Sequence, residues 1–164
     1  MNGDGTLLVF GFGNPGRTDD GVGVWVADRI DELGRDDIVV ETPMQLNLED
    51  AAAIAGSEAV LFIDADVTAR APYVFRRACA AGRIEFSSHA MSPEALLAVC
   101  AEYFSQPPPA WILGIRGCDF GLGEVLTPAA RANAGKAVEF IANWLDSWRE
   151  AAAAECPNEG AAYA

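Results

Sequence analysis

The segment Leu7–Asp20, LLVFGFGNPGRTDD, constrains the fold more than any other part of the chain. Its opening apolar run is continuous rather than alternating, which is typical of a strand buried on both faces. A strand cannot continue through the glycines and the proline that follow, so the chain must turn where the sheet ends. In an open α/β sheet such a turn lies at the carboxyl edge of the strands, which is where ligands bind.

Two functions fit this glycine-rich turn. The glycines of Gly11–Gly16 have the spacing Gly-x-Gly-x-x-Gly of a dinucleotide-binding turn, and the next predicted strand ends in an acid, Glu41. Asp19 and Asp20 follow directly, however, and each would repel a bound pyrophosphate by roughly 1 kcal/mol in water. The alternative is that the glycines permit a sharp bend while Asp20 points a carboxylate ligand into the cleft. Either aspartate can also serve only as a helix cap.

The chain has the size of one globular domain. Its 164 residues are 51% hydrophobic, which is enough for a proper core and too few for separate cofactor and substrate domains. We expect residues 1–149 to form a single α/β domain. Residues 150–164, EAAAAECPNEGAAYA, offer little to bury and are expected to be a disordered tail.

The charge and the apolar segments exclude several classes of partner. A formal net charge of −13 repels nucleic acid and anionic membrane surfaces and suits a metal ion or a partner with basic patches. No apolar stretch reaches the roughly 18 residues of a membrane-spanning helix, and the N-terminus lacks the features of a secretory signal. We therefore expect a cytoplasmic protein, and the sequence sets no expectation for its oligomeric state.

The cysteines give no sign of a structural metal or of a disulfide framework. The chain has four of them, none in a C-x-x-C spacing, and we expect all to be reduced. Cys118 could form a thiolate–imidazole pair with His89 if their loops converge, and no Gly-x-Ser-x-Gly turn marks a serine nucleophile. The cysteines are Cys79, Cys100, Cys118 and Cys156.

The order of predicted elements indicates a mostly parallel sheet with helices on both faces. Helices are predicted to follow the strands, and two of them begin with a cap followed by proline, at Ser92 and Thr127. Residues 72–86 are expected to be less regular, as an antiparallel edge hairpin. The predicted strands are 6–12, 37–41, 59–63 and 111–115, and the predicted helices begin near residues 20, 48, 92 and 127.

This topology gathers three candidate ligands into one crevice. Asp20 follows the first strand, Asp64 follows the third, and His89 precedes a helix. Because His89 is the only histidine, zinc sites that need two histidines are excluded. Two carboxylates and one imidazole remain an incomplete ligand set for a divalent ion such as nickel, zinc or manganese, with positions open for an outside ligand. Asp64 and Asp66 are an alternative acid–base pair.

Three segments of the chain resemble the motifs of the NiFe-hydrogenase maturation endopeptidases. Members of this family remove a short C-terminal peptide from the nickel-loaded large-subunit precursor. The glycines, asparagine and paired aspartates of Gly11–Gly23 resemble the opening motif, and Ile63–Ala65 resembles the second, acidic motif. Ser88–His89, followed by the helix that begins at Ser92–Glu94, resembles the histidine motif. The likeness extends from about residue 6 to residue 141.

The resemblance implies a site and a reaction. The acids of the first two motifs and the histidine of the third form the family's metal site, and the matching residues are Asp20, Asp64 and His89. They are the expected catalytic residues and metal ligands. The family often has Glu at the first position, so Asp20 is a shorter ligand and Asp19 remains an alternative, whereas Asp66 matches less well than Asp64. The divalent metal implied is nickel supplied by the substrate precursor.

The resemblance also implies the fold and the activity. The fold is a three-layer α/β/α sandwich of the phosphorylase/hydrolase-like kind, with a mostly parallel twisted sheet of about five strands. The activity is that of a peptidase that removes the C-terminal extension of a NiFe-hydrogenase large-subunit precursor and recognises its bound nickel. The segment Gln45–Asp50 looks closer to the branch of the family that processes soluble, cofactor-reducing hydrogenases.

Two other functions stay open at this stage. A dinucleotide-binding, Rossmann-like module would bind NAD or FAD at the glycine-rich turn. A non-proteolytic metal-insertion chaperone would bind the precursor without shortening it.

Overall fold

A five-stranded sheet with the order β2-β1-β3-β5-β4 forms the middle layer of the computed structural model, which describes residues 5–81 and 91–154. β1, β2, β3 and β5 are parallel, and β4 runs antiparallel to β5 at one edge. The predicted α/β class with a mostly parallel sheet is therefore confirmed. The strands are β1 Leu7–Gly11, β2 Ile38–Glu41, β3 Ala59–Asp66, β4 Tyr73–Ala78 and β5 Ala110–Arg116.

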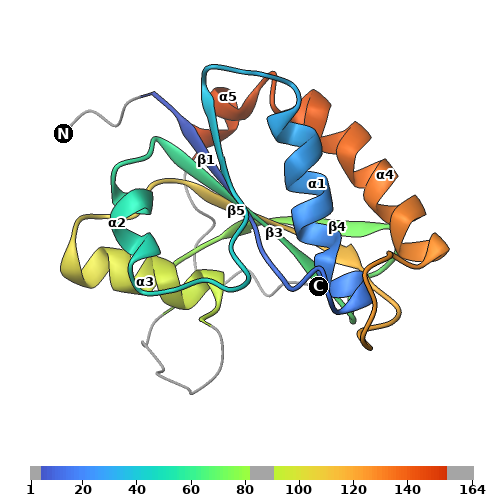
Figure 1. The fold of residues 1–164 in the computed structure, drawn as a ribbon. Helices are drawn as coiled ribbons and strands as arrows, with labels where there is room; N and C mark the ends of the chain where they lie inside the picture. The colour runs from blue at the N-terminus through green and yellow to red at the C-terminus, as the bar shows by residue number, and fades with distance from the viewer. Residues whose placement is uncertain (1–4, 82–90, 155–164) are drawn as a thin grey trace.

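Helices cover both faces of the sheet, as Figure 1 shows. α1, α4 and α5 pack on one face, and α2 and α3 pack on the other. A short 3₁₀ turn, η1 Thr18–Gly21, precedes the first helix. The helices are α1 Val22–Asp31, α2 Asp50–Ala55, α3 Pro93–Tyr103, α4 Pro128–Trp144 and α5 Trp148–Ala152.

The pleat of each strand divides the core into two halves. Odd-numbered residues such as Leu7 and Val9 pack against α1, α4 and α5, and even-numbered residues such as Leu8 and Phe10 pack against α2 and α3. All four side chains are buried, as a continuous apolar run predicts for a central parallel strand. A strand buried on both faces can expose functional residues only at its ends, which places the site at an edge of the sheet.

The two capped helices begin where the sequence predicts. The Ser92 hydroxyl accepts a hydrogen bond from the Ala95 amide at 3.1 Å at the start of α3. The Thr127 hydroxyl accepts one from the Ala130 amide at 3.2 Å at the start of α4. Proline follows each cap, where its missing N–H costs nothing.

Several sequence expectations need correction or lie outside the described residues. β3 runs through Asp66, so Asp64 belongs to the end of the strand rather than to the loop after it. The edge strand β4 pairs with β5, and residues 82–90 of the expected hairpin are not among the described residues. α5 crosses the expected domain boundary after residue 149, and residues 155–164 of the expected tail are also outside.

The expectation that all cysteines are reduced is wrong for Cys79, which is disulfide-bonded. Cys100 and Cys118 carry free thiols. Cysteine spacing alone carries no information on pairs that are distant in sequence.

Within residues 5–81 and 91–154, none of the helices has the length and hydropathy needed to cross a membrane.

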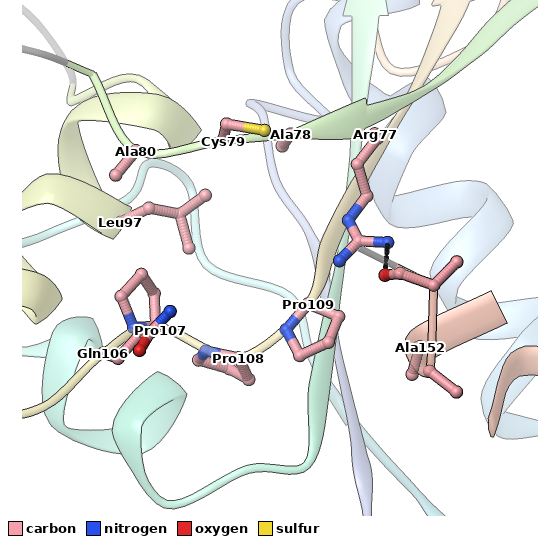
Figure 2. Close-up of a pocket in the computed structure, with 12 residues that line it drawn as sticks. Arg77, Ala78, Cys79, Ala80, Leu97, Gln106, Pro107, Pro108, Pro109 and Ala152 are labelled. Atoms are coloured by element: carbon pink, nitrogen blue, oxygen red, sulfur yellow. Dashed lines mark hydrogen bonds between the residues drawn. The ribbon is translucent and has the colours of Figure 1, made fainter. Parts of the chain in front are cut away.

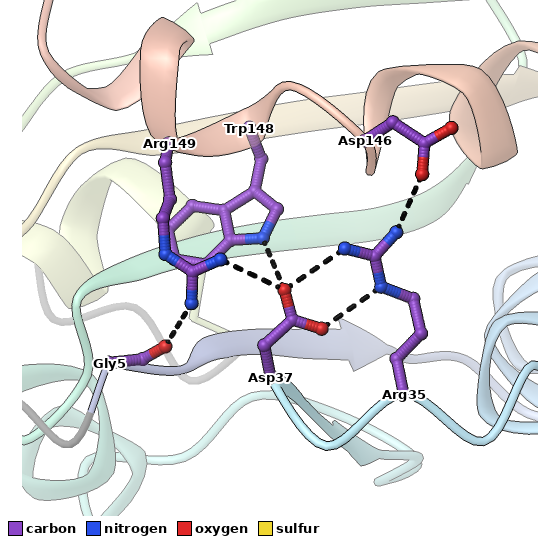
Figure 3. Close-up of polar contacts among 6 residues, drawn as sticks. All are labelled: Gly5, Arg35, Asp37, Asp146, Trp148 and Arg149. Atoms are coloured by element: carbon purple, nitrogen blue, oxygen red, sulfur yellow. Dashed lines mark hydrogen bonds and ion pairs between the residues drawn. The ribbon is translucent and has the colours of Figure 1, made fainter.

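Asp37 is the centre of a cluster of hydrogen bonds and ion pairs, the Asp37 cluster, at the amino edge of the sheet (Figure 3). Asp37 receives two hydrogen bonds from Arg35, each 3.0 Å long, one from the Trp148 indole at 3.2 Å and one from Arg149 at 3.1 Å. Arg149 also donates to the Gly5 carbonyl at 2.7 Å. These contacts join the start of β2 and the segment before β1 to α5, and the donors hold the pKa of Asp37 far below its ordinary range, with Arg35 the main cause.

We expect Asp37→Asn to lower the free energy of unfolding by about 2 kcal/mol at pH 7, because it removes a charge-assisted, partly buried cluster. The pKa of Asp37 is lower in the folded state than in the unfolded state, so its ionised carboxylate stabilises the protein fully above the unfolded-state pKa near 4. This contribution is lost as the pH falls through the folded-state pKa. Urea unfolding at pH 7 and at pH 3 measures both effects. The difference should narrow only in part between pH 7 and pH 3, because Asp37 stays ionised in the folded protein at pH 3. A difference that widens at pH 3 would contradict this explanation.

Candidate functional site

A pocket of about 380 Å³ opens at the carboxyl edge of the sheet. Its walls come from the loop after β1, the loop after β2 and the end of β3, so the convergence predicted for the carboxyl ends of the strands is observed. Asp20 and Asp64, two of the three predicted site residues, both line it. The lining residues are Phe12, Gly13, Asn14, Asp20, Met44, Gln45 and Asp64.

The glycines of the turn serve close backbone packing. A Cβ atom at Gly13, whose φ is 136°, would lie 2.0 Å from the Asp20 carbonyl oxygen. A Cβ at Gly11 would lie 2.5 Å from the Gly23 carbonyl oxygen, and a Cβ at Gly23 would lie 2.5 Å from the Ile63 carbonyl oxygen. No side chain fits at these positions, so the spacing that resembles a dinucleotide-binding turn is explained by the packing of β1 and β3 against α1.

Asn14 fixes the orientation of the Asp20 carboxylate. The backbone N–H of Asn14 donates to Asp20 Oδ2 at 2.7 Å, across the turn that the two residues close. Asp20 is partly buried and faces the pocket from η1. The place of Asn14 inside the glycine-rich turn was the one signal in the sequence for this backbone contact.

Asp64 reaches the same pocket from the end of β3, and its environment disfavours the charged form. Burial raises the pKa of its carboxyl to about 7, and repulsion from Asp20 and Asp66 acts in the same direction. One hydrogen bond, from the Ala65 amide at 2.8 Å, opposes the shift only in part. Two carboxylates that repel each other in a partly desolvated pocket form a site that a cation would stabilise.

Asp19, the alternative left by the sequence, does not line the pocket, because its carboxylate is used by the fold. Its side chain is fully buried and accepts four hydrogen bonds, all from the loop after β5. The donors are the amides of Cys118, Asp119 and Thr127 and the Thr127 hydroxyl, at 2.8 to 3.0 Å. Burial alone would raise the pKa of Asp19, but these bonds outweigh it and the net shift is downward.

Asp66 is likewise used by the fold. One of its carboxylate oxygens accepts hydrogen bonds from the Thr68 amide at 2.8 Å, the Thr68 hydroxyl at 2.8 Å and the Ala69 amide at 3.1 Å. Burial raises the pKa of Asp66, but these bonds and the nearby Arg76 charge lower it more. An acid–base pair of Asp64 and Asp66 is therefore disfavoured, since Asp66 is engaged in the turn after β3.

The third predicted site residue, His89, lies outside the described residues, so its distance from the pocket remains a prediction. The same holds for its proposed pairing with Cys118, whose thiol is free and exposed. The part of the chain that the structure describes contains no group of three His, Cys, Asp or Glu side chains able to hold a metal ion. It contributes a pair of carboxylates, and a complete ligand set needs a further donor.

A larger pocket, of about 690 Å³, lies away from these residues (Figure 2). It borders the ends of β4 and α5 and the proline segment Pro107–Pro109 before β5. Among the described residues that line it, the one charged side chain is that of Arg77, whose guanidinium stacks over the Trp111 ring, 4.9 Å from its centroid, and donates to the Ala154 carbonyl at 3.2 Å. The other described lining residues are prolines, alanines, Leu97, Gln106 and the disulfide-bonded Cys79, so this described lining offers no acid, base or free nucleophile for hydrolysis.

Solved structures of similar fold include proteins named as hydrogenase maturation proteases. The NiFe hydrogenase maturation protease HycI from Thermococcus kodakarensis matches over 87% of this chain and 93% of its own, with a TM-score of 0.65 and 24% identity. The hydrogenase maturating endopeptidase HybD from E. coli matches over the same shares, with a TM-score of 0.69 and 19% identity. No protein-family model matches the sequence, and no curated protein matches it significantly.

The chain has the fold of these maturation proteases. An endopeptidase from Escherichia coli solved in solution adds to the set, with a TM-score of 0.68, 20% identity and coverage of 89% of this chain and 93% of its own. The resemblance drawn from the sequence motifs is thereby confirmed at the level of the fold. The five-stranded, mostly parallel α/β architecture is confirmed with it.

We expect Asp64→Asn to stabilise the protein by about 2 kcal/mol at pH 8 in the presence of a chelator. The folded-state pKa of about 7 lies above the ordinary value of 3.8, so ionisation of Asp64 costs the folded state stability as the pH rises between these values. Urea unfolding at pH 4, 6 and 8 measures the difference. The proteins should be alike at pH 4 and separate by pH 8, and a variant less stable than wild type at pH 8 would contradict the assignment.

We expect Asp19→Asn to lower the free energy of unfolding by about 3 kcal/mol, because an amide nitrogen would face backbone donors in a buried position. Asp20→Asn, at the neighbouring position, is the matched control and should change stability by less than about 1 kcal/mol. Chemical denaturation of both variants at pH 7 compares them. Equal losses would show that the two aspartates do not have the separate roles assigned here.

Proposed function

We propose that this protein is an endopeptidase that removes the C-terminal extension of a nickel-loaded NiFe-hydrogenase large-subunit precursor. One observation carries the proposal: Asp20 and Asp64, which match the acidic motifs of the maturation endopeptidases, line one pocket although Asp20 comes from the 3₁₀ turn after β1 and Asp64 from β3. The fold shared with HycI and HybD supports the same reaction. The precursor is the proposed partner, and the cytoplasm is the compartment in which the two would meet.

The proposed site would recognise nickel that belongs to the substrate. Asp20 and Asp64 supply carboxylate oxygens, and His89 is proposed to add an imidazole nitrogen, which together make a donor set suited to a divalent ion. An incomplete set is appropriate where the precursor holds the ion with its own ligands. Nickel bound in this way would polarise groups beside it, as metal ions do in other hydrolases.

The residues of this chain would act mainly by positioning. Asn14 holds the Asp20 carboxylate by a bond of 2.7 Å, and Ala65 holds that of Asp64 by one of 2.8 Å, so both acids are oriented before a substrate arrives. Docking of the precursor's metal on these oxygens would bring the peptide to be cut alongside the pocket. Fixing reactants in this way accounts for a large part of the rate in many enzymes.

The dinucleotide-binding alternative fits the geometry less well. The glycines pack backbone against backbone, and the pocket beside them presents two carboxylates. A pyrophosphate placed there would meet like charge, whereas dinucleotide sites present helix amides and neutral groups. The observed arrangement favours a cation over an anion.

The test is processing of a purified, nickel-loaded large-subunit precursor from the same organism, followed by intact mass spectrometry. We expect the precursor to lose its C-terminal peptide with wild-type protein and to be cut at least about 100-fold more slowly by Asp20→Asn or Asp64→Asn. His89→Ala should abolish processing. Precursor prepared without nickel should remain intact, because recognition depends on the bound ion.

Asp37→Asn is the matched control, since it removes a carboxylate with four hydrogen bonds at the far edge of the sheet. It should process the precursor at close to the wild-type rate at a temperature where it stays folded. Binding of the precursor without any loss of mass would identify a metal-insertion chaperone instead. Saturable binding of NAD, or normal processing by both pocket variants, would also overturn the proposal.

A further inference from the structure

We infer that the loop between β5 and α4 docks the folded body of the protein substrate, with Leu122 and Val125 as the apolar contacts. This inference rests on the proposed function and concerns how the precursor is held outside the pocket. The loop spans residues 117–127 and passes beside the start of α1, where Figure 1 shows it in orange next to the blue turn.

Leu122 and Val125 are unusually exposed for their type. Leu122 is 85% exposed and Val125 is 76% exposed, the two highest values among the large apolar side chains of the described residues. Neither belongs to either hydrophobic core cluster. Two such side chains close together in sequence raise the free energy of the isolated protein's surface without stabilising its fold, which is typical of a surface that a partner covers.

The loop that carries them is rigidly attached. Gly123 accepts a hydrogen bond from the Thr18 amide at 2.8 Å and donates one to the Gly16 carbonyl at 3.0 Å, and the Thr18 hydroxyl donates to the Gly121 carbonyl at 2.7 Å. The four bonds to Asp19 anchor the two ends of the loop. Leu122 therefore lies between two glycines that are both bonded to one residue of the 3₁₀ turn.

Rigid attachment matters for binding, because it removes the cost of ordering the loop when a partner arrives. Thr18 has a φ of 53°, a left-handed conformation that a β-branched residue rarely adopts. The surrounding hydrogen bonds maintain this conformation. Backbone strain of this kind is found where a local structure is held for function.

The loop is joined to the pocket through adjacent residues. Asp19 holds the loop, and Asp20, the next residue, lines the pocket. The pocket lies on the side of the sheet covered by α2 and α3, since Asp64 shares the pleat of Val60 and Phe62, whereas the loop leads into α4 on the opposite side. A ligand that contacts both the pocket and the 117–127 loop must extend across the carboxyl edge of the sheet. A folded protein is large enough to do so, and a free metal ion is not.

The chemistry around the loop specifies the partner surface. Asp119 and Glu124 are exposed and lie within three residues of the apolar pair in the sequence, and the chain carries a net charge of −13. A complementary surface would present an apolar patch bordered by Lys or Arg. The docking surface of the precursor should have this character, and it should lie next to the segment that enters the pocket.

The test compares two double variants in binding and processing of the nickel-loaded precursor. We expect Leu122→Ser/Val125→Ser to raise the Kd for the precursor, measured by biolayer interferometry, about 10-fold or more. The KM for processing should rise in parallel, with kcat within about threefold of wild type, because the pocket is unchanged. Binding of Ni²⁺ alone, measured by calorimetry, should be the same for both proteins.

Leu33→Ser/Val39→Ser is the matched control, because it removes one exposed leucine and one exposed valine, 51% and 45% exposed, away from the pocket. It should leave the Kd and KM unchanged. An unchanged Kd for Leu122→Ser/Val125→Ser, or an equal rise for the control pair, would overturn the docking inference while processing by wild type still supports the proposed function. Binding by wild type without processing would overturn the proposed function, and the two Kd values would still decide the docking inference.

Discussion

The buried carboxylate of Asp19 is the interaction on which the arrangement of the site depends. It joins the turn after β1 to the loop after β5 through contacts between residues 99 or more positions apart in sequence, beside an isolated β-bridge between Arg17 and Gly123. An ionised group with no exposed surface is costly unless hydrogen bonds compensate it, and four donors from one loop do so here. Because those donors are backbone amides and one capping hydroxyl, the loop must keep its conformation for Asp19 to remain satisfied.

Near each acidic motif, one aspartate is used by the fold and another lines the pocket. In the first motif Asp19 accepts four hydrogen bonds from the β5 loop, and just after the second motif one carboxylate oxygen of Asp66 accepts three from the turn after β3. Asp20 and Asp64 are the members that line the pocket. The hydrogen bonds of Asp19 and Asp66 fix the backbone nearby. Asp20 and Asp64 are then held in partly desolvated positions that they would not adopt freely.

The sequence predicted the architecture well because long apolar runs, caps and prolines act locally. The continuous run of β1 and the Ser92 and Thr127 caps placed strands and helices correctly, and the topology then brought Asp20 and Asp64 to one edge. It could not separate Asp19 from Asp20, because their roles depend on donors about 100 residues away. For the same reason the sequence could not predict the position of the 117–127 loop, which is set by backbone contacts with residues distant in the chain.

The Asp37 cluster has a consequence for how such a protein can change. Its bonds lie at the amino edge of the sheet, joining β2 and the first residues to α5, while the repelling acids lie at the carboxyl edge. The Asp37 cluster is thus separated from the pocket by the length of the strands. New specificities can therefore accumulate by mutation in the loop after β2, which contributes Met44 and Gln45 to the pocket, without eroding the contacts of Asp37.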